Sequence, residues 1–176
     1  MITVPMIKWA ICLHDIGKYS TPIDILPSHY EHEVRGLSHI NDICDRLKIP
    51  NNYRNFSLLC CKNHMRFIKI IKMKISKKYD FVYEISNGFK DKNLLDSFLL
   101  VCKCDYFSEQ YNETMANEFY EAINEIYKIF SIMYGITLKD LPEKTQEDLS
   151  KQKGEKFGKL YRDAMISYLK FNLKNS

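Results

Sequence analysis

The chain has 176 residues with a formal net charge of +4, and 45% of its residues are hydrophobic. This apolar content excludes an intrinsically disordered chain, and the length suits one domain with a sizeable core. The mildly basic charge is compatible with an anionic partner without requiring one. The first apolar run is too short for a signal peptide or a membrane span, so we expect a soluble, cytoplasmic protein with no membrane partner.

Helical periodicity dominates the chain and predicts an all-α fold. In chain order, we expect helices over residues 4–15, 29–49, 51–64, 76–85, 91–107, 113–134 and 155–171. Asn51 and Asn52 are candidate caps for the third of these helices, and Ser76 is a candidate cap for the fourth. The β-branched run at 67–75 is also compatible with a strand, but one or two isolated strands do not build a sheet.

Apolar stripes predict which face of each helix is buried. In the second helix the stripe consists of Val34, Leu37, Ile40, Cys44 and Leu47. In the last helix it consists of Phe157, Leu160, Ala164 and Ile166. The polar stretch 137–154 before the last helix is predicted to be a loose connection. We therefore expect one domain over residues 1–135, with residues 136–176 forming a connection and a C-terminal helix packed on it.

The cysteines lie within apolar helical patterns, and none belongs to a Cys-x-x-Cys pair. Free cysteine behaves as a small hydrophobic residue, which predicts buried, reduced thiols. This prediction applies to Cys12, Cys44, Cys60, Cys61, Cys102 and Cys104. A cysteine-ligated zinc site is the less favoured alternative.

The stretch AICLHDIGKYSTP ends an apolar helix in the pair His14-Asp15. Neighbouring side chains project about 100° apart on a helix, so an ion between them needs further ligands from other helices. Candidates follow on successive helices: His29, His32, His64 and Asp105. Such mixed nitrogen and oxygen ligation favours manganese, iron, nickel, cobalt or zinc over calcium. Lys18 follows the pair by one turn and is placed to hold a phosphate oxygen by charge.

A run of cations without an intervening acid spans residues 62–78. The cations are Lys62, Arg66, Lys69, Lys72, Lys74, Lys77 and Lys78. They suit the phosphates of a nucleic acid, with Lys62, Arg66, Lys69 and Lys72 as the candidate contacts. An ordinary solvated helix face has the same composition. Phe67 within the run either stacks on a base or anchors the segment to the core.

The ordered motifs LHDIGK, HEVRG, NH and CDY resemble those of the HD superfamily of metal-dependent phosphohydrolases. Residues 8–64 in particular are similar to the HD domain of multifunctional bacterial tRNA nucleotidyltransferases, the CCA-adding enzymes. The tail KGEKFGKLYRDAM is similar to the closing helix of that family. The resemblance implies a helical HD-domain bundle over residues 1–135, followed by a C-terminal helical tail.

The same resemblance implies a phosphohydrolase that acts on RNA ends or nucleotides, cleaving 2′,3′-cyclic phosphodiesters, 2′-nucleotides and phosphate monoesters. The implied cofactor is one or two divalent ions of magnesium, manganese, nickel, cobalt or zinc. The implied metal ligands are His14, Asp15, His32, His64 and Asp105. Asp15 and Lys18 are the implied catalytic residues, because Asp15 would bridge two ions and Lys18 would contact phosphate.

The sequence departs from the family in three ways. It lacks the Gly-Ser and Asp-x-Asp motifs of the nucleotidyltransferase half, and it begins after the place of an upstream histidine ligand. Ser108 and Glu109 replace a Gly-Arg pair that usually follows the aspartate. These departures are typical of a separately encoded piece of a longer ancestral enzyme.

Two alternatives to a hydrolase therefore stay open. One is a non-catalytic tRNA-binding body or a subunit of a split tRNA nucleotidyltransferase, in which the basic run matters most. The other is a degenerate fragment or a dimerisation module. The expected partners are an RNA or nucleotide phosphate substrate, tRNA, and a second copy or a nucleotidyltransferase chain that supplies the missing helix.

Overall fold

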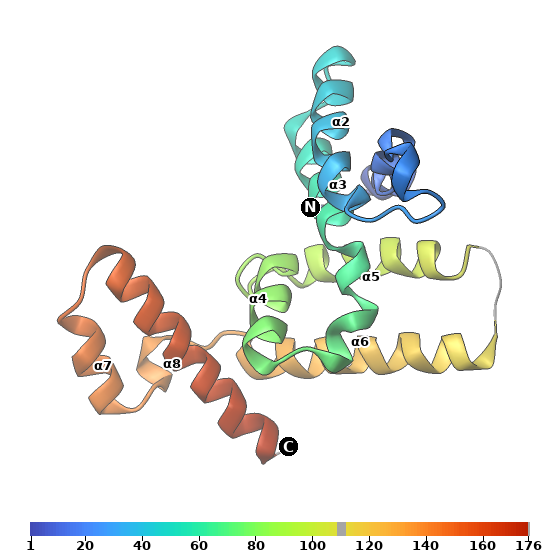
Figure 1. The fold of residues 1–176 in the computed structure, drawn as a ribbon. Coiled ribbons are helices and arrows are strands. Elements are labelled where there is room, and N and C mark those ends of the chain that lie inside the picture. The colour runs from blue at the N-terminus through green and yellow to red at the C-terminus, as the bar shows by residue number, and fades with distance from the viewer. Residues whose placement is uncertain (109–111, 176) are drawn as a thin grey trace.

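The computed structural model describes residues 1–108 and 112–175, and every regular element in these ranges is helical (Figure 1). The α-helices are α1 (Val4–Leu13), α2 (His32–Arg46), α3 (Asn51–Asn63), α4 (Ile75–Ile85), α5 (Lys92–Tyr106), α6 (Glu113–Met133), α7 (Glu143–Ser150) and α8 (Gly154–Lys174). Short 3₁₀ helices join them: η1 (Ile16–Ser20), η2 (Ile23–Ile25), η3 (His64–Arg66), η4 (Ile68–Lys72) and η5 (Leu138–Asp140). The predicted all-α class is confirmed, and the run compatible with a strand forms η4.

Two clusters of buried apolar side chains hold the helices together. The larger lies among α1, α3, α4, α5, α6 and α8, and its fully buried rings are Phe67, Phe81, Phe98 and Phe119. The smaller joins α1, α2 and α3 through Leu13, Ile40, Cys44 and Cys61. Figure 1 shows α1, α2 and α3 at one end of the molecule and the α7–α8 pair at the other. Since α1 and α3 each contribute residues to both clusters, these two helices connect the two parts of the core.

Three details of the helices differ from the sequence prediction. Pro50 is the N-cap of α3, so Asn51 and Asn52 are its first residues instead of its caps. Lys74 precedes α4, and Ser76 lies inside its first turn. The stretch predicted to be a loose connection contains η5 and α7, because Leu141 and Leu149 give it apolar side chains to bury. The domain boundary expected at residue 135 stays a prediction.

The apolar stripes were only partly predicted. In α2, Ile40 and Cys44 are buried as expected, but Val34 and Leu47 are 61% and 52% exposed. His32 and Gly36 take the inward positions instead, because this end of α2 faces polar groups and a backbone segment. In α8 the buried residues are Met165, Ile166 and Leu169. Of the cysteines predicted to be buried, Cys12 and Cys104 are exposed.

The backbone of η1 touches the first turn of α2 at Gly17. A Cβ atom on Gly17 would lie 1.9 Å from the carbonyl oxygen of His32 and 2.6 Å from the backbone nitrogen of Gly36. Both neighbours are main-chain atoms of a helix, so neither can move aside without shifting α2. Only glycine therefore permits this contact, which places the residues just before η1 against the start of α2.

We expect Gly17→Ala to lower the free energy of unfolding by about 1–3 kcal/mol, because the added methyl group overpacks a main-chain contact. Urea unfolding followed by circular dichroism measures this change. Gly158→Ala in α8 is the matched control, since a Cβ atom there has no neighbour within 4 Å. That variant should be neutral or more stable by up to about 1 kcal/mol. Equal stability of the two variants would contradict the proposed close contact.

Candidate metal centre

Five side chains from four helices and their ends meet where α1, α2, α3 and α5 approach one another. α1 ends at Leu13, and His14 is its C-cap. The first residue of α2 and the residue that caps α3 supply the next two imidazoles, and α5 supplies a carboxylate one residue before it ends. The five are the ligands implied by the sequence: His14, Asp15, His32, His64 and Asp105. The structure brings all five together, while their role as metal ligands stays a prediction.

Asp15 lies at the centre of the group and faces imidazoles with both carboxylate oxygens. Its Oδ1 atom is 2.9 Å from Nε2 of His32 and 3.3 Å from Nε2 of His64. Its Oδ2 atom is 3.4 Å from Nε2 of His14 and also contacts the ammonium group of Lys18. Asp105 completes the group, with its Oδ1 atom 3.1 Å from Nε2 of His14. One carboxylate therefore reaches two sets of nitrogen atoms, the geometry of a bridging ligand.

Each imidazole of the group is oriented by a main-chain hydrogen bond. The Nδ1 atoms of His14, His32 and His64 lie 2.7, 2.8 and 2.9 Å from the carbonyl oxygen three residues earlier. A carbonyl only accepts, so Nδ1 carries the proton and Nε2 points towards Asp15. Metal-ligating histidines are oriented in this way in proteins.

The donor set contains more lone pairs than the protons between them can satisfy. The Nε2 atoms of His32 and His64 are 3.1 Å apart, a separation that leaves room for one proton at most. Oδ1 of Asp15 is buried between them and has no hydrogen-bond partner in the described part of the chain. Ligand atoms of His14, Asp15 and His64 also all lie within 4.8 Å of one another. These residues fit a divalent cation, because it would satisfy all the lone pairs at once.

The two carboxylates draw positive charge to this place. Burial lowers the pKa of His14, but hydrogen bonds to Asp105, Asp15 and the Ile11 carbonyl outweigh burial and raise it from 6.5 to about 10. Burial likewise opposes the charge of Asp15, but contacts with His14, His64 and Lys18 hold the pKa of Asp15 well below its usual value. The hydrogen bond from His14 lowers the pKa of Asp105 against the effect of burial. A proton on His14 thus occupies a position that equally attracts a metal ion.

The candidate ligand His29 and the remaining histidine, His39, lie outside this group. His29 is half-buried, and its Nδ1 atom is 2.7 Å from the hydroxyl oxygen of Thr21. His39 contacts the Ser20 hydroxyl at 2.7 Å, away from Asp15. Of the pair that replaces Gly-Arg in the family, Glu109 lies outside the described residues.

The basic run divides into paired and unpaired cations. Lys62 and Arg66 both pair with Glu84, at 2.7 and 3.2 Å, and Lys78 pairs with Glu125. Glu84 lies more than twenty residues from Lys62, so no local pattern could have revealed this neutralisation. Within the basic run, the exposed cations with no ion pair to a described residue are Lys69, Lys72, Lys74 and Lys77.

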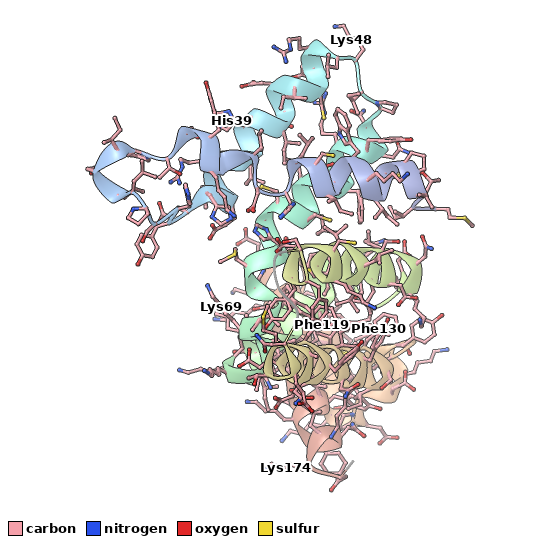
Figure 2. The ribbon with its side chains drawn as sticks, turned by 90° about the vertical axis from the view of Figure 1, so that its right-hand side faces the viewer. His39, Lys48, Lys69, Phe119, Phe130 and Lys174 are labelled. Carbon is pink, nitrogen blue, oxygen red and sulfur yellow. The ribbon has the colours of Figure 1, made fainter. Side chains whose placement is uncertain are left out.

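Phe67 anchors the basic run to the core. Its side chain is 1% exposed, and its ring centroid lies 5.0 Å from that of Phe119. Of the two roles left open by the sequence, base stacking is therefore wrong for Phe67. Phe119 is itself fully buried, whereas Figure 2 shows Lys69 projecting from the surface.

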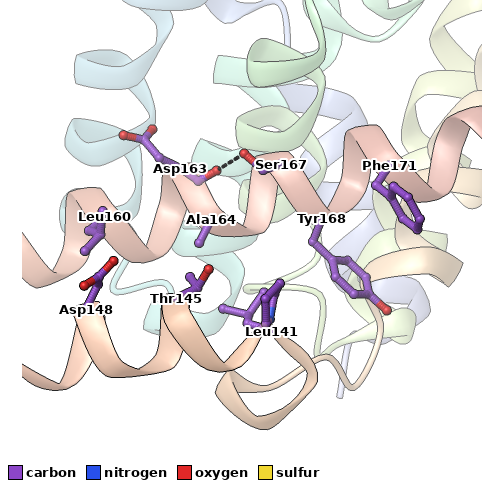
Figure 3. A pocket seen from close by; sticks show the side chains of 10 residues that line it. Leu141, Thr145, Asp148, Leu160, Asp163, Ala164, Ser167, Tyr168 and Phe171 are labelled. Carbon is purple, nitrogen blue, oxygen red and sulfur yellow. Dashed lines mark hydrogen bonds between the residues drawn. The ribbon is translucent and has the colours of Figure 1, made fainter.

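A separate cavity of about 550 Å³ lies between α7 and α8 (Figure 3). Leu160, Ala164, Tyr168 and Phe171 of α8 give it an apolar wall. None of the five side chains around Asp15 lines it, and the cavity carries no catalytic constellation of its own. The cavity is therefore separate from the Asp15 group.

These observations define an all-α protein with a cluster of imidazole and carboxylate groups suited to a metal ion. Over 93% of its length the chain is 27% identical to the Multifunctional CCA protein of Acinetobacter baylyi. The chain is 35% identical to the Multifunctional CCA protein of Thioalkalivibrio sulfidiphilus over 57% of its length. It is 29% identical to the Multifunctional CCA protein of Legionella pneumophila over 69% of its length. The similarity to the CCA-adding enzymes that was inferred from the sequence is thus confirmed.

The matches cover only part of each relative: 38%, 24% and 29% of those three proteins in the same order. The chain thus spans between about a quarter and two fifths of the length of these curated relatives. No family model matches the chain. No solved structure matches it either. Among the described residues, no helix combines the length and the apolar character needed to cross a membrane.

In metal-free protein, we expect His14 to titrate near pH 10. The substitution Asp105→Asn should lower the pKa of His14 by about one unit or more, because it removes a negative charge beside the imidazole. Because the folded-state pKa exceeds the unfolded value of 6.5, this protonation stabilises the fold fully below pH 6.5, and the stabilisation is lost as the pH rises towards 10. An NMR titration of the imidazole protons measures both values. Asp163→Asn, on α8, is the control and should leave His14 unchanged.

Proposed function

We propose that this protein is a metal-dependent phosphohydrolase that cleaves 2′,3′-cyclic phosphodiesters and phosphate esters on RNA ends or nucleotides. The observation that carries the proposal is the orientation of three imidazoles by main-chain carbonyls, so that their Nε2 atoms surround the carboxylate of Asp15. Similarity to the Multifunctional CCA proteins supports a tRNA-related role.

The residues of the group and Lys18 would have separate roles in the reaction. His14, Asp15, His32, His64 and Asp105 would hold one or two ions of magnesium, manganese, nickel, cobalt or zinc, with Asp15 shared between both sides. A bound divalent ion supplies a water of lowered pKa and polarises phosphoryl oxygens. Lys18 is half-exposed beside Asp15, and its ammonium group would neutralise the charge of a phosphoryl oxygen in the transition state. The main-chain carbonyls hold the imidazoles in place, so little reorganisation is needed during the reaction.

We expect chelator-treated protein to regain hydrolysis of bis-p-nitrophenyl phosphate and of a 2′,3′-cyclic nucleotide when manganese, nickel, cobalt or zinc is added. Asp15→Asn should weaken metal binding in calorimetry at least tenfold and reduce turnover at least a hundredfold, because it removes the shared charge. His39→Gln is the control, since His39 lies outside the group, and it should bind and turn over as the wild type. Unchanged turnover in Asp15→Asn would show the assignment to be wrong.

RNA binding is the second candidate function. It is favoured by the basic run, whose apolar residues are buried while several of its cations remain exposed. Ile70 is fully buried and Phe67 faces the core, so η4 turns its apolar residues inward. The exposed face of η4 carries Lys69 and Lys72 and is therefore cationic. Figure 2 shows Lys69 on the same side of the molecule as the protruding blue segment that follows α1. Such a face suits a polyanion such as tRNA. This function is compatible with hydrolysis and also with a non-catalytic subunit of a split tRNA nucleotidyltransferase.

We expect the double variant Lys69→Gln, Lys72→Gln to bind tRNA more weakly and to reduce the slope of log K against log salt by about 1 to 2, because two phosphate contacts are lost. Filter binding or anisotropy at several salt concentrations measures the slope. Lys62→Gln removes the same charge from a residue already neutralised by Glu84, and it should have little effect. Salt-independent binding by the wild type would exclude this candidate.

A further inference from the structure

His32 differs from the other two imidazoles in the location of its carbonyl partner. Ile11 lies within α1 and Cys61 within α3, so His14 and His64 are oriented by their own helices. His29 precedes α2, which begins at His32 itself, and Glu31 between them has a φ of +59°. The orientation of the His32 ring therefore depends on a segment that is not part of any α-helix.

Arg35 contacts that segment at Tyr30 and the preceding part of the chain at Thr21 and Gly17. Its Nη1 atom donates to the carbonyl oxygen of Tyr30 at 2.6 Å, and its Nη2 atom donates to the hydroxyl oxygen of Thr21 at 3.1 Å. Its Nε atom reaches the carbonyl oxygen of Gly17 at 3.4 Å. The Thr21 hydroxyl in turn lies 2.7 Å from Nδ1 of His29. Because Thr21 accepts from Arg35, its own proton is free to point at His29.

We propose that Arg35 is a positioning residue for the metal centre, acting on His32 through Thr21 and His29. The inference rests on the proposed metal-binding function. The planar guanidinium holds three acceptors in a fixed arrangement, which a lysine ammonium cannot reproduce. With Tyr30 and Thr21 held, the His29 carbonyl stays 2.8 Å from Nδ1 of His32, and the Nε2 atom of His32 faces Asp15.

The direct test uses Arg35→Met, with Arg46→Met as the control at the exposed end of α2. We expect Arg35→Met to weaken zinc or manganese binding about tenfold in calorimetry, the lower end of the range for residues that orient a metal ligand. In metal-free protein, the NMR signal of the Nδ1 proton of His32 should broaden or vanish. The corresponding signals of His14 and His64 should persist, and they serve as internal controls for folding.

A milder pair of variants tests the same chain of contacts if Arg35→Met fails to fold. Thr21→Val keeps the shape of the side chain but removes the hydroxyl between Arg35 and His29. It should therefore weaken metal binding and broaden the NMR signal of the Nδ1 proton of His32. Thr21→Ser keeps the hydroxyl and should retain both. If Arg35→Met and Thr21→Val keep wild-type affinity and the His32 signal, the inference is overturned. If the wild type binds no metal, the proposed function fails, while the loss or retention of the His32 signal still decides the role of Arg35.

Discussion

The close approach of η1 to α2 is the constraint on which the rest of the site depends. A main-chain carbonyl of α2 occupies the space where any side chain at residue 17 would lie. The second glycine of this contact, Gly36, faces the Sγ atom of Cys61, which would lie 2.6 Å from an added Cβ atom. The two glycines thus allow η1, α2 and α3 to pack closely against one another. The shared carboxylate precedes the first glycine by two residues, so the same contact places Asp15 against the start of α2 and the end of α3.

The resulting group of lone pairs is costly for a fold to maintain by itself. Partly buried carboxylates and buried imidazoles without enough protons between them disfavour the folded state, unless a cation joins them. An apolar core of the same volume would be more stable, and the smaller apolar cluster beside the group shows that this part of the chain has apolar side chains to bury. The proton that the carboxylates hold on His14 is a partial remedy, since it neutralises one charge and leaves the nitrogen atoms of His32 and His64 facing each other. This imbalance is a physical argument for ligand binding that does not depend on any relative.

The sequence predicted the elements that repeat a local pattern, but it missed features produced by contacts between distant segments. The convergence of side chains around Asp15 was predictable, because histidines and aspartates at the ends of successive apolar helices have few structural reasons to be there. The exposure of Val34 was not predictable, because the orientation of α2 is set by the main-chain contact with Gly17. The neutralisation of Lys62 by Glu84 was missed for the same reason, as the two residues belong to different helices. The helix α7 was missed because its polar sequence shows little periodicity, and only Leu149 is buried.

The end of α3 relates the two proposed activities to each other. His64 caps this helix and faces Asp15, and the chain then continues directly into η3 and η4. Lys69 follows His64 by five residues, and an extended residue spans at most about 3.6 Å, so the two Cα atoms are at most about 18 Å apart. A single strand of a few nucleotides bridges such a distance. If the centre hydrolyses a phosphate at an RNA end, the next phosphates of that strand fall within reach of Lys69 and Lys72, and the protein would then prefer a terminal phosphate on a chain over the same group on a free nucleotide.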